Sequence, residues 1–168
     1  GVTIIDGSGM STTPDRLFDI FAAATGEFDG RTLQGGDGGG SGGGAVFVRT
    51  GADLTINNSI VDDNTSNNGG AIQNNGLFTA TFTTFSNNSG NSGAAIDNSG
   101  TLSLTDVVIT GNTATNAGGG IRNNSSATLD RVLISGNLAN QGGGIHHGGG
   151  GAVMDLTNVT ISGNTATT

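Results

Sequence analysis

Short apolar stretches alternate with clusters of glycine, asparagine and serine along most of the chain. A cluster of small residues that ends in an aliphatic residue recurs every 24 to 26 residues, at 43–46, 69–72, 93–96, 118–121 and 142–145. A second motif, an apolar residue followed three positions later by asparagine, recurs in the same frame. Its copies are Val61/Asn64, Phe85/Asn88, Ile109/Asn112, Ile134/Asn137 and Ile161/Asn164. Two motifs that share one period indicate a repeat architecture.

Each repeat contains three stretches with period-two alternation, bounded by turn-forming residues. This pattern predicts three short strands joined by three turns. Such short strands need partners, and each can pair in parallel with its equivalent one repeat later, about 4.8 Å away. The sequence therefore predicts an all-β fold, a single-stranded parallel β-helix (solenoid) of about six coils of 24–28 residues. We expect two inward columns of stacked apolar residues, Val46, Ile72, Ile96, Ile121 and Ile145 on one wall and Val61, Phe85, Ile109, Ile134 and Ile161 on another.

The first 42 residues fit the repeat less closely. Thr13 and Pro14 have the character of a helix start. The register instead favours a strand over 16–21, because Phe18 lies 28 residues before Val46. The glycine run at 35–44 predicts a flexible corner between coils. We expect a single domain over 1–168, with longer irregular coils over 1–42 and regular repeats over 43–168, as an excerpt of a longer chain.

The recurrent asparagine has a role in this scheme. Its short amide both donates and accepts hydrogen bonds, and asparagine tolerates turn conformations that most residues avoid. We therefore expect a structural ladder between coils made of Asn64, Asn88, Asn112, Asn137 and Asn164. A second, shorter ladder is expected from Asn74, Asn98 and Asn123, with His147 at the equivalent place in the next coil.

Composition narrows the classes of partner. The chain has 168 residues, 13 acidic residues, five basic residues that are all arginine, a net charge of −8 and no cysteine. This charge disfavours a nucleic-acid partner, and the apolar runs are too short for membrane insertion by this segment. Without cysteine the chain has no disulfide or thiolate zinc site. The absence of lysine and the single glutamate, Glu27, leave few candidate catalytic bases.

The paired motifs Gly-Gly-Ala-Ile at 69–72 and Phe-x-x-Asn at 85–88 resemble the repeats of chlamydial polymorphic outer-membrane proteins and related surface proteins. The resemblance spans about 43–168, and 1–42 is similar to the first coils of large bacterial exported β-helix proteins. It implies a right-handed single-stranded parallel β-helix, an extracellular or cell-surface location, and a role in adhesion or as a structural stalk. Right-handed β-helices also include pectate-lyase-like enzymes, so the fold leaves the activity open.

One outward column is the candidate binding site. Gln73, Asp97, Arg122 and His146 follow the aliphatic residue of the first strand in successive coils, and we expect them to be exposed. The resemblance to pectate-lyase-like enzymes implies that such a column could bind or cleave an acidic glycan. The simpler interpretation is a surface ion pair beside a solvated histidine. We assign no catalytic residue and keep a polysaccharide lyase or hydrolase as the alternative function.

Two further features have weaker functional interpretations. Asp62 and Asp63 form the one adjacent acidic pair and could bind calcium with nearby asparagines, although a solubilising edge explains them more simply. No other metal or cofactor is expected. Outward residues such as Thr79 and Thr81 resemble the ice-binding faces of β-solenoids, but Asp130 and Asp155 interrupt this array.

The expected function is that of a non-catalytic structural or adhesive segment of an exported bacterial cell-surface protein. Both ends of such a repeat array would present unpaired strand edges, which attract further strands. The expected partners are therefore the rest of a larger parent chain or head-to-tail copies, together with a surface glycan or a cell-surface receptor.

Overall fold

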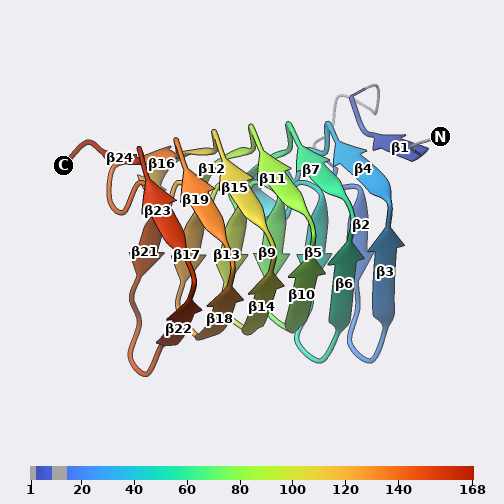
Figure 1. Cartoon of the computed structure of the whole chain (residues 1–168). Helices are drawn as coiled ribbons and strands as arrows, with labels where there is room; N and C mark the ends of the chain where they lie inside the picture. Colours follow the sequence, from blue (N-terminus) through green and yellow to red (C-terminus); the bar gives the residue numbers. More distant parts are fainter. Residues whose placement is uncertain (1–2, 9–14) are drawn as a thin grey trace.

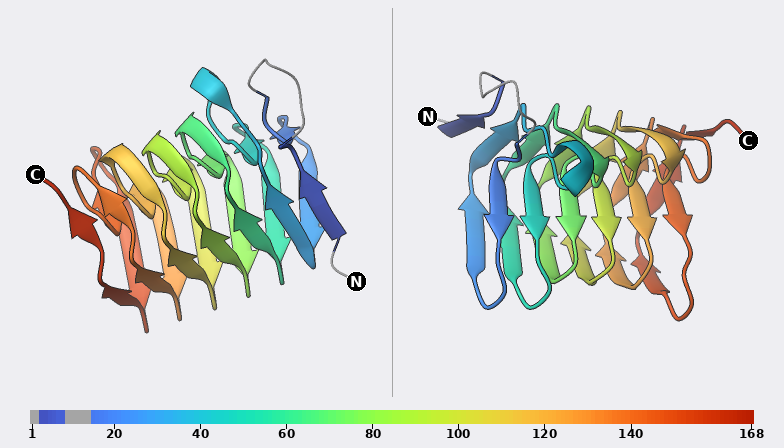
Figure 2. Two further views of the ribbon diagram at one scale, coloured as in Figure 1. Left: turned by 90° about the horizontal axis from the view of Figure 1, so that it is seen from above. Right: turned by 180° about the vertical axis from the view of Figure 1, so that it is seen from behind.

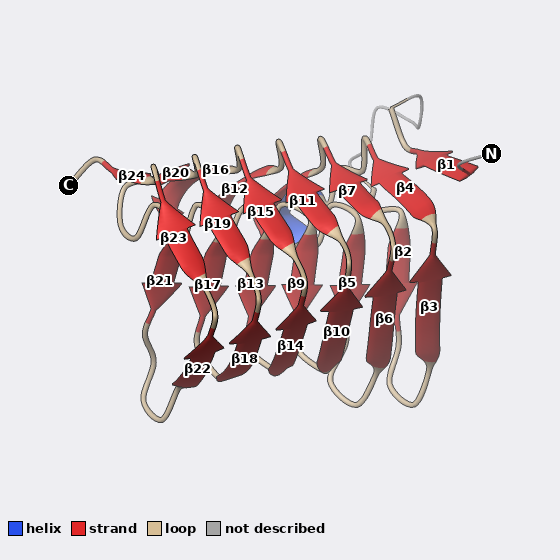
Figure 3. Ribbon diagram, in the orientation of Figure 1, coloured by secondary structure: helices blue, strands red, loops and turns tan. Residues whose placement is uncertain are grey.

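The computed structural model describes residues 3–8 and 15–168. They form an all-β parallel solenoid of about six turns (Figure 1). The described residues are almost entirely short strands and loops, with one turn of 3-10 helix, η1 (Gly39–Ser41) (Figure 3). No helix in the described ranges is long and apolar enough to cross a membrane.

Four parallel sheets run along the solenoid, and a regular coil passes through them in the order B, C, A, D. Sheet B contains β2 (Phe18–Ile20), β5 (Val46–Val48), β9 (Ile72–Asn74), β13 (Ile96–Asn98), β17 (Ile121–Asn123) and β21 (Ile145–His147). Sheet C contains β3 (Thr25–Asp29), β6 (Asp53–Asn57), β10 (Leu77–Thr81), β14 (Thr101–Thr105), β18 (Ser126–Asp130) and β22 (Val153–Thr157). Sheet A contains β1 (Thr3–Asp6), β4 (Arg31–Gln34), β7 (Ile60–Asp62), β11 (Thr84–Ser86), β15 (Val108–Thr110), β19 (Leu133–Ser135) and β23 (Thr160–Ser162). Sheet D contains β8 (Thr65–Asn68), β12 (Ser89–Ser92), β16 (Thr113–Ala117), β20 (Leu138–Ala139) and β24 (Thr165–Ala166).

The solenoid is right-handed. In Figure 1 the chain rises through the near strands, such as β3 and β4, and descends through the far strands, such as β5 and β9. It advances meanwhile from the N-terminus at the right to the C-terminus at the left. The view from behind in Figure 2 shows the descending strands of sheet B facing the reader, with sheet D above them. This is the hand that parallel crossover connections almost always take.

The strand register confirms that equivalent residues stack. Ile96 pairs with Ile72 on one side and with Ile121 on the other. In the first coils, Phe18 pairs with Val46, so a strand, β2, lies where the register favoured one over a helix. The helix signal at Thr13 and Pro14 lies outside the described residues.

The core consists of apolar columns that are fully shielded by the coils on either side. The inward columns of sheets A and B are at most 1% exposed through the middle coils, as are both inward columns of sheet C. Where one coil places Phe78 and Phe85, their rings meet edge to face with centroids 6.2 Å apart, and the neighbouring inward position is the small Ala80. The small Ala80 thus offsets the volume of the two rings within this coil.

The prediction of three strands per coil is wrong, because the segment after each ladder asparagine forms the fourth sheet, D. Its inward residues are small, as at Ser66, Gly90 and Ala114. Backbone lies close to this position, because a Cβ on Gly90 would be 2.6 Å from the Ser66 carbonyl oxygen and 3.4 Å from the Gly70 nitrogen. Hydrophobic alternation therefore gave no signal for this sheet.

The glycine run at 35–44 follows a defined path. Asp37 forms a parallel bridge with Thr65, and the backbone N–H of Gly38 donates to the Thr65 carbonyl at 2.9 Å. Between them and β5 the chain makes η1, which sits against β8. The run therefore connects two coils, and its residues 37–42 also form an edge beside sheet D, called the lip below.

Candidate binding groove

The predicted column on sheet B is in register, but Gln73 and Asp97 are buried and Arg122 and His146 are only partly exposed, which corrects the expectation from the sequence. Gln73 pairs with Asp97, Asp97 with Arg122 and Arg122 with His146. Gln73 is only 9% exposed and Asp97 is 0% exposed. The glycine corner before each strand lies close to this column, and a Cβ on Gly93 would be 2.8 Å from the Asp97 Cα.

Asp97 and Arg122 form a two-pronged ion pair between neighbouring coils. The Arg122 Nε donates to Asp97 Oδ1 at 2.9 Å and Nη2 donates to Oδ2 at 2.8 Å. Burial raises the pKa of the Asp97 carboxyl above its ordinary value, and the hydrogen bonds and charge of Arg122 oppose that shift. Because the carboxylate is buried and both its oxygens are engaged, it cannot reach a substrate in solution.

The two histidines do not form a site with this pair. The Nδ1 of His146 is buried and has no hydrogen-bond partner among the described residues. His147 lies on the other face of the strand, where its Nδ1 is 3.2 Å from Asn123 Nδ2. It thereby ends the second ladder, in which Asn74 donates to Asn98 and Asn98 to Asn123, both at 2.7 Å.

The asparagines between sheets A and D are brought together as a continuous ladder. The Nδ2 of Asn112 donates to Asn137 Oδ1 at 2.9 Å and to the Phe85 carbonyl at 3.1 Å. Its Oδ1 accepts the backbone N–H and the Nδ2 of Asn88, both at 3.0 Å. Each amide therefore spans three coils. The same arrangement links Asn64, Asn88, Asn112, Asn137 and Asn164.

Of the two adjacent acidic residues, Asp62 ends strand β7 and Asp63 lies in the corner that follows it. Asp62 accepts hydrogen bonds from Ser86 Oγ at 2.6 Å and Asn87 Nδ2 at 2.9 Å. Asp63 occupies a corner position with φ +51. Among the described residues, no group of three histidine, aspartate or glutamate side chains is placed to hold a metal ion.

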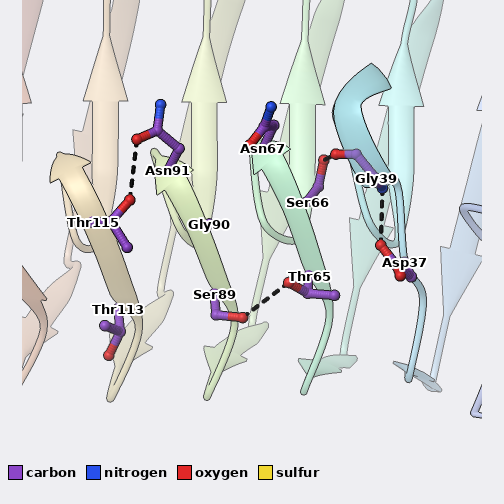
Figure 4. Close-up of a pocket in the computed structure, with 10 residues that line it drawn as sticks. All are labelled: Asp37, Gly39, Thr65, Ser66, Asn67, Ser89, Gly90, Asn91, Thr113 and Thr115. Carbon is purple, nitrogen blue, oxygen red and sulfur yellow. Dashed lines mark hydrogen bonds between the residues drawn. The ribbon is translucent and has the colours of Figure 1, made fainter. Parts of the chain in front are cut away.

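A groove lies instead on the outer face of sheet D, next to η1, and the sequence did not predict it. Its volume is about 510 Å³. Figure 4 shows its floor, with outward side chains from β8, β12 and β16. One row of outward residues is Thr65, Ser89 and Thr113, and the other is Asn67, Asn91 and Thr115. All six are exposed.

The lip of the groove is held by three hydrogen bonds that Figure 4 and the backbone contacts define. The Oδ1 of Asp37 accepts the backbone N–H of Gly39 at 2.9 Å, and Ser66 Oγ donates to the Gly39 carbonyl at 3.3 Å. The third is the bond from Gly38 to Thr65 already described. Gly42, which follows η1, packs against Gln73, where a Cβ would lie 3.0 Å from its Oε1. Gly42 also has φ +84, a conformation that residues with a side chain rarely adopt, so glycine is favoured at this position.

Within each row, one hydrogen bond links side chains of neighbouring coils. Ser89 Oγ donates to Thr65 Oγ1 at 3.1 Å, and Thr115 Oγ1 donates to Asn91 Oδ1 at 3.0 Å. These bonds leave the amino group of Asn91 and the lone pairs of Ser89 and Thr115 facing solvent. The signal for this face was present in the sequence as an alternation of polar and small residues after each ladder asparagine, at 65–67, 89–91 and 113–115.

Comparison of the chain with models of known families, with curated proteins and with solved structures finds no match. The parallel solenoid is therefore assigned from the structure itself.

Proposed function

We propose that this chain is a non-catalytic segment of an exported cell-surface protein, of the kind whose repeats its motifs resemble. It acts as a stiff support that presents polar faces for adhesion outside the cell. Its partners are a surface glycan or a receptor on another cell, and the coils of its parent chain or of a second copy continue its sheets at the ends.

The observation that carries this proposal is the continuity of the ladder between sheets A and D. Each amide bonds to the coils on both sides, so no coil can bend away from its neighbours without breaking buried hydrogen bonds. The apolar columns add cohesion in the same direction. Such a repeat suits a rod that transmits force and holds a surface in place.

The alternative of a lyase or hydrolase depends on Asp97, Arg122 and His146. The buried ion pair of Asp97 with Arg122 is poorly suited to general acid or base chemistry, because neither group is free to exchange a proton with a substrate. This burial favours the structural and adhesive proposal.

The test combines adhesion with a product assay. Beads coated with the whole chain should be retained on glycan-bearing cell layers under flow, compared with beads coated with albumin. Incubation with polygalacturonate and other acidic glycans, with and without calcium, should release no unsaturated or reducing ends. Retention equal to that of albumin beads would refute the adhesive role. Product release that is lost in a folded Arg122→Ala variant would establish the enzyme instead, with His146→Ala as a second variant if the first does not fold.

A further inference from the structure

We propose that the groove on sheet D binds a neutral glycan, as a segment of about three sugar units that lies along the solenoid axis with one end against η1. This inference rests on the proposed adhesive function and assigns its ligand class and its site.

The lining of the groove points to a ligand rich in hydroxyl groups. The six outward side chains of its floor are hydroxyls and primary amides, which both donate and accept hydrogen bonds. Within the described part of the chain, no aliphatic or aromatic side chain that would favour an apolar ligand lines the floor. A carbohydrate presents groups of the same double character, and it can bond to Ser89, Asn91 and Thr115 through the atoms that their mutual bonds leave free.

Charge selects a neutral carbohydrate over an acidic one. Among the described residues that line the groove, Asp37 is the only ionisable side chain, and it is acidic. The chain as a whole carries a net charge of −8. A uronate, sulfate or phosphate in the groove would meet repulsion and would find no cation. For a neutral sugar, the Asp37 carboxylate is instead a strong hydrogen-bond acceptor for the sugar hydroxyl groups.

The spacing of the rows fits an extended glycan. Neighbouring coils present equivalent groups about 4.8 Å apart. This distance is close to the advance of one pyranose unit along an extended chain, so successive sugars can meet successive coils in the same way. A peptide lacks this match, because the backbone groups of sheet D are committed to its own ladder and only side chains face the groove.

Both ends of the site are defined. At β8 the lip formed by Asp37 and η1 stands over the floor. At the other end, the first row changes from Thr113 to its register partner Leu138, which is 38% exposed and offers no hydrogen bond. Three strands, β8, β12 and β16, lie between these limits, which sets the expected length of about three sugars.

The experiment measures binding of neutral oligosaccharides of increasing length to the whole chain. Cello-, xylo-, manno- and chito-oligosaccharides of one to six units are titrated while backbone amide NMR signals are followed, with hexagalacturonate as the acidic comparison. At least one neutral series should shift the signals of Asn67, Ser89 and Asn91. Its affinity should rise up to the trisaccharide and change little beyond it. Hexagalacturonate should bind at least about tenfold more weakly.

A matched pair of variants locates the site. Ser89→Leu with Asn91→Leu changes two outward residues of β12 and should weaken binding about tenfold or more. Thr79→Leu with Thr81→Leu makes the same change on β10 in sheet C and should leave binding unchanged. Circular dichroism and thermal melting confirm that both fold. Leu138→Thr extends the first row by one coil and should move the limiting length from about three sugars to about four.

The proposal is overturned if no neutral oligosaccharide shifts these signals at about 10 mM, if hexagalacturonate binds more tightly, or if both double variants bind equally well. If no neutral oligosaccharide binds but the coated beads still adhere to cells, the adhesive function is retained and its ligand is a different one, such as a protein receptor. Glycan binding in solution without bead retention would instead remove the adhesive function and keep the site.

Discussion

Asn88, Asn112 and Asn137 follow one another along the corner between sheets A and D, whereas Gln73, Asp97 and Arg122 follow one another on sheet B. The first column repeats one residue type, and each amide bonds to the coil before it and the coil after it. The second column changes type at each coil, and its strongest contact is a single pair, Asp97 with Arg122. A group that must bond in both directions has to be repeated, while a group that needs one partner can vary.

The largest effect is expected from breaking the repeated column in its middle. Asn112→Ala removes the acceptor for two donors of Asn88 and the donor to the Phe85 carbonyl, all of them buried. We expect a loss of about 3–4 kcal/mol in the free energy of unfolding, measured by urea denaturation. Asn91→Ala, on the exposed face of sheet D, is the control and should cost about 0.5 kcal/mol or less. Equal losses would show that the ladder has no special role.

Substitutions in the column of Gln73, Asp97 and Arg122 should lower the free energy of unfolding less than Asn112→Ala does. The size of the loss should depend on whether an unpaired charge remains. Asp97→Leu leaves the Arg122 guanidinium without its carboxylate and should cost about 2–4 kcal/mol. Asp97→Leu combined with Arg122→Met should cost less than Asp97→Leu alone, because the unpaired charge is then gone. Unfolding free energies of the two single variants and the double variant measure this coupling.

A second ion pair provides the control for that cycle. Arg131 bonds to Asp106 through the same two nitrogens at 2.7 and 2.8 Å, also between neighbouring coils, but at an exposed corner. Asp106 has φ +54, which asparagine tolerates, so Asp106→Asn is compared with Asp97→Asn. Asp106→Asn should have a much smaller effect than Asp97→Asn, since solvent screens the exposed pair. If the two substitutions cost the same, burial does not explain the behaviour of the column on sheet B.

The pH dependence separates the buried carboxylate from the neutral amides. Burial raises the pKa of Asp97 in the folded chain, so the folded state binds its proton at a pH where the unfolded state has lost it. The contribution of Asp97 to stability is therefore largest at acidic pH and falls as pH rises through the raised pKa. As the pH is lowered from about 7 to about 4, the free energy of unfolding of the wild-type chain should therefore rise relative to that of Asp97→Asn. A difference that shrinks on acidification would contradict the raised pKa.

The smallest effect concerns a column in which the backbone conformation repeats and the side chain does not. The corner between sheets C and A has positive φ in every coil, with φ +49 at Asn58 and at Phe82 and φ +54 at Asp106. Phe82 is 62% exposed, so little burial offsets its strained backbone. Phe82→Asn should raise the free energy of unfolding by about 0.5–1 kcal/mol in urea denaturation. A loss of stability would show that the ring makes a packing contribution that outweighs the strain.

These columns also show why some features could be predicted from the sequence. Ile72, Ile96 and Ile121 are large, apolar and periodic, so their place on an inward wall follows from their chemistry and spacing. Asp97 has the same periodicity, but its burial depends on Arg122 from the next coil and on the corner at Gly93. Exposure of a polar residue is decided by what covers it, and alternation along one strand does not contain that information.

Sheet D extends the same lesson to the groove. Its strands have small inward residues, so the apolar alternation used to count strands was absent there. The position of the lip depends on how Gly39 meets Ser66, a contact between residues of neighbouring coils. The exposed rows of hydroxyls and amides were legible as a pattern, but the groove requires the lip and the floor together.

The sequence by itself determined the coil length, the stacking of equivalent residues and the parallel direction of the strands. These follow from a fixed period, because identical groups at regular spacing find their best partners in their own copies one coil away. Only the tertiary structure decided that a fourth sheet exists, that Asp97 is buried and that η1 closes one end of a polar groove. Each of these depends on the angle at which the chain turns between sheets, which brings together residues whose individual chemistry does not specify the contact.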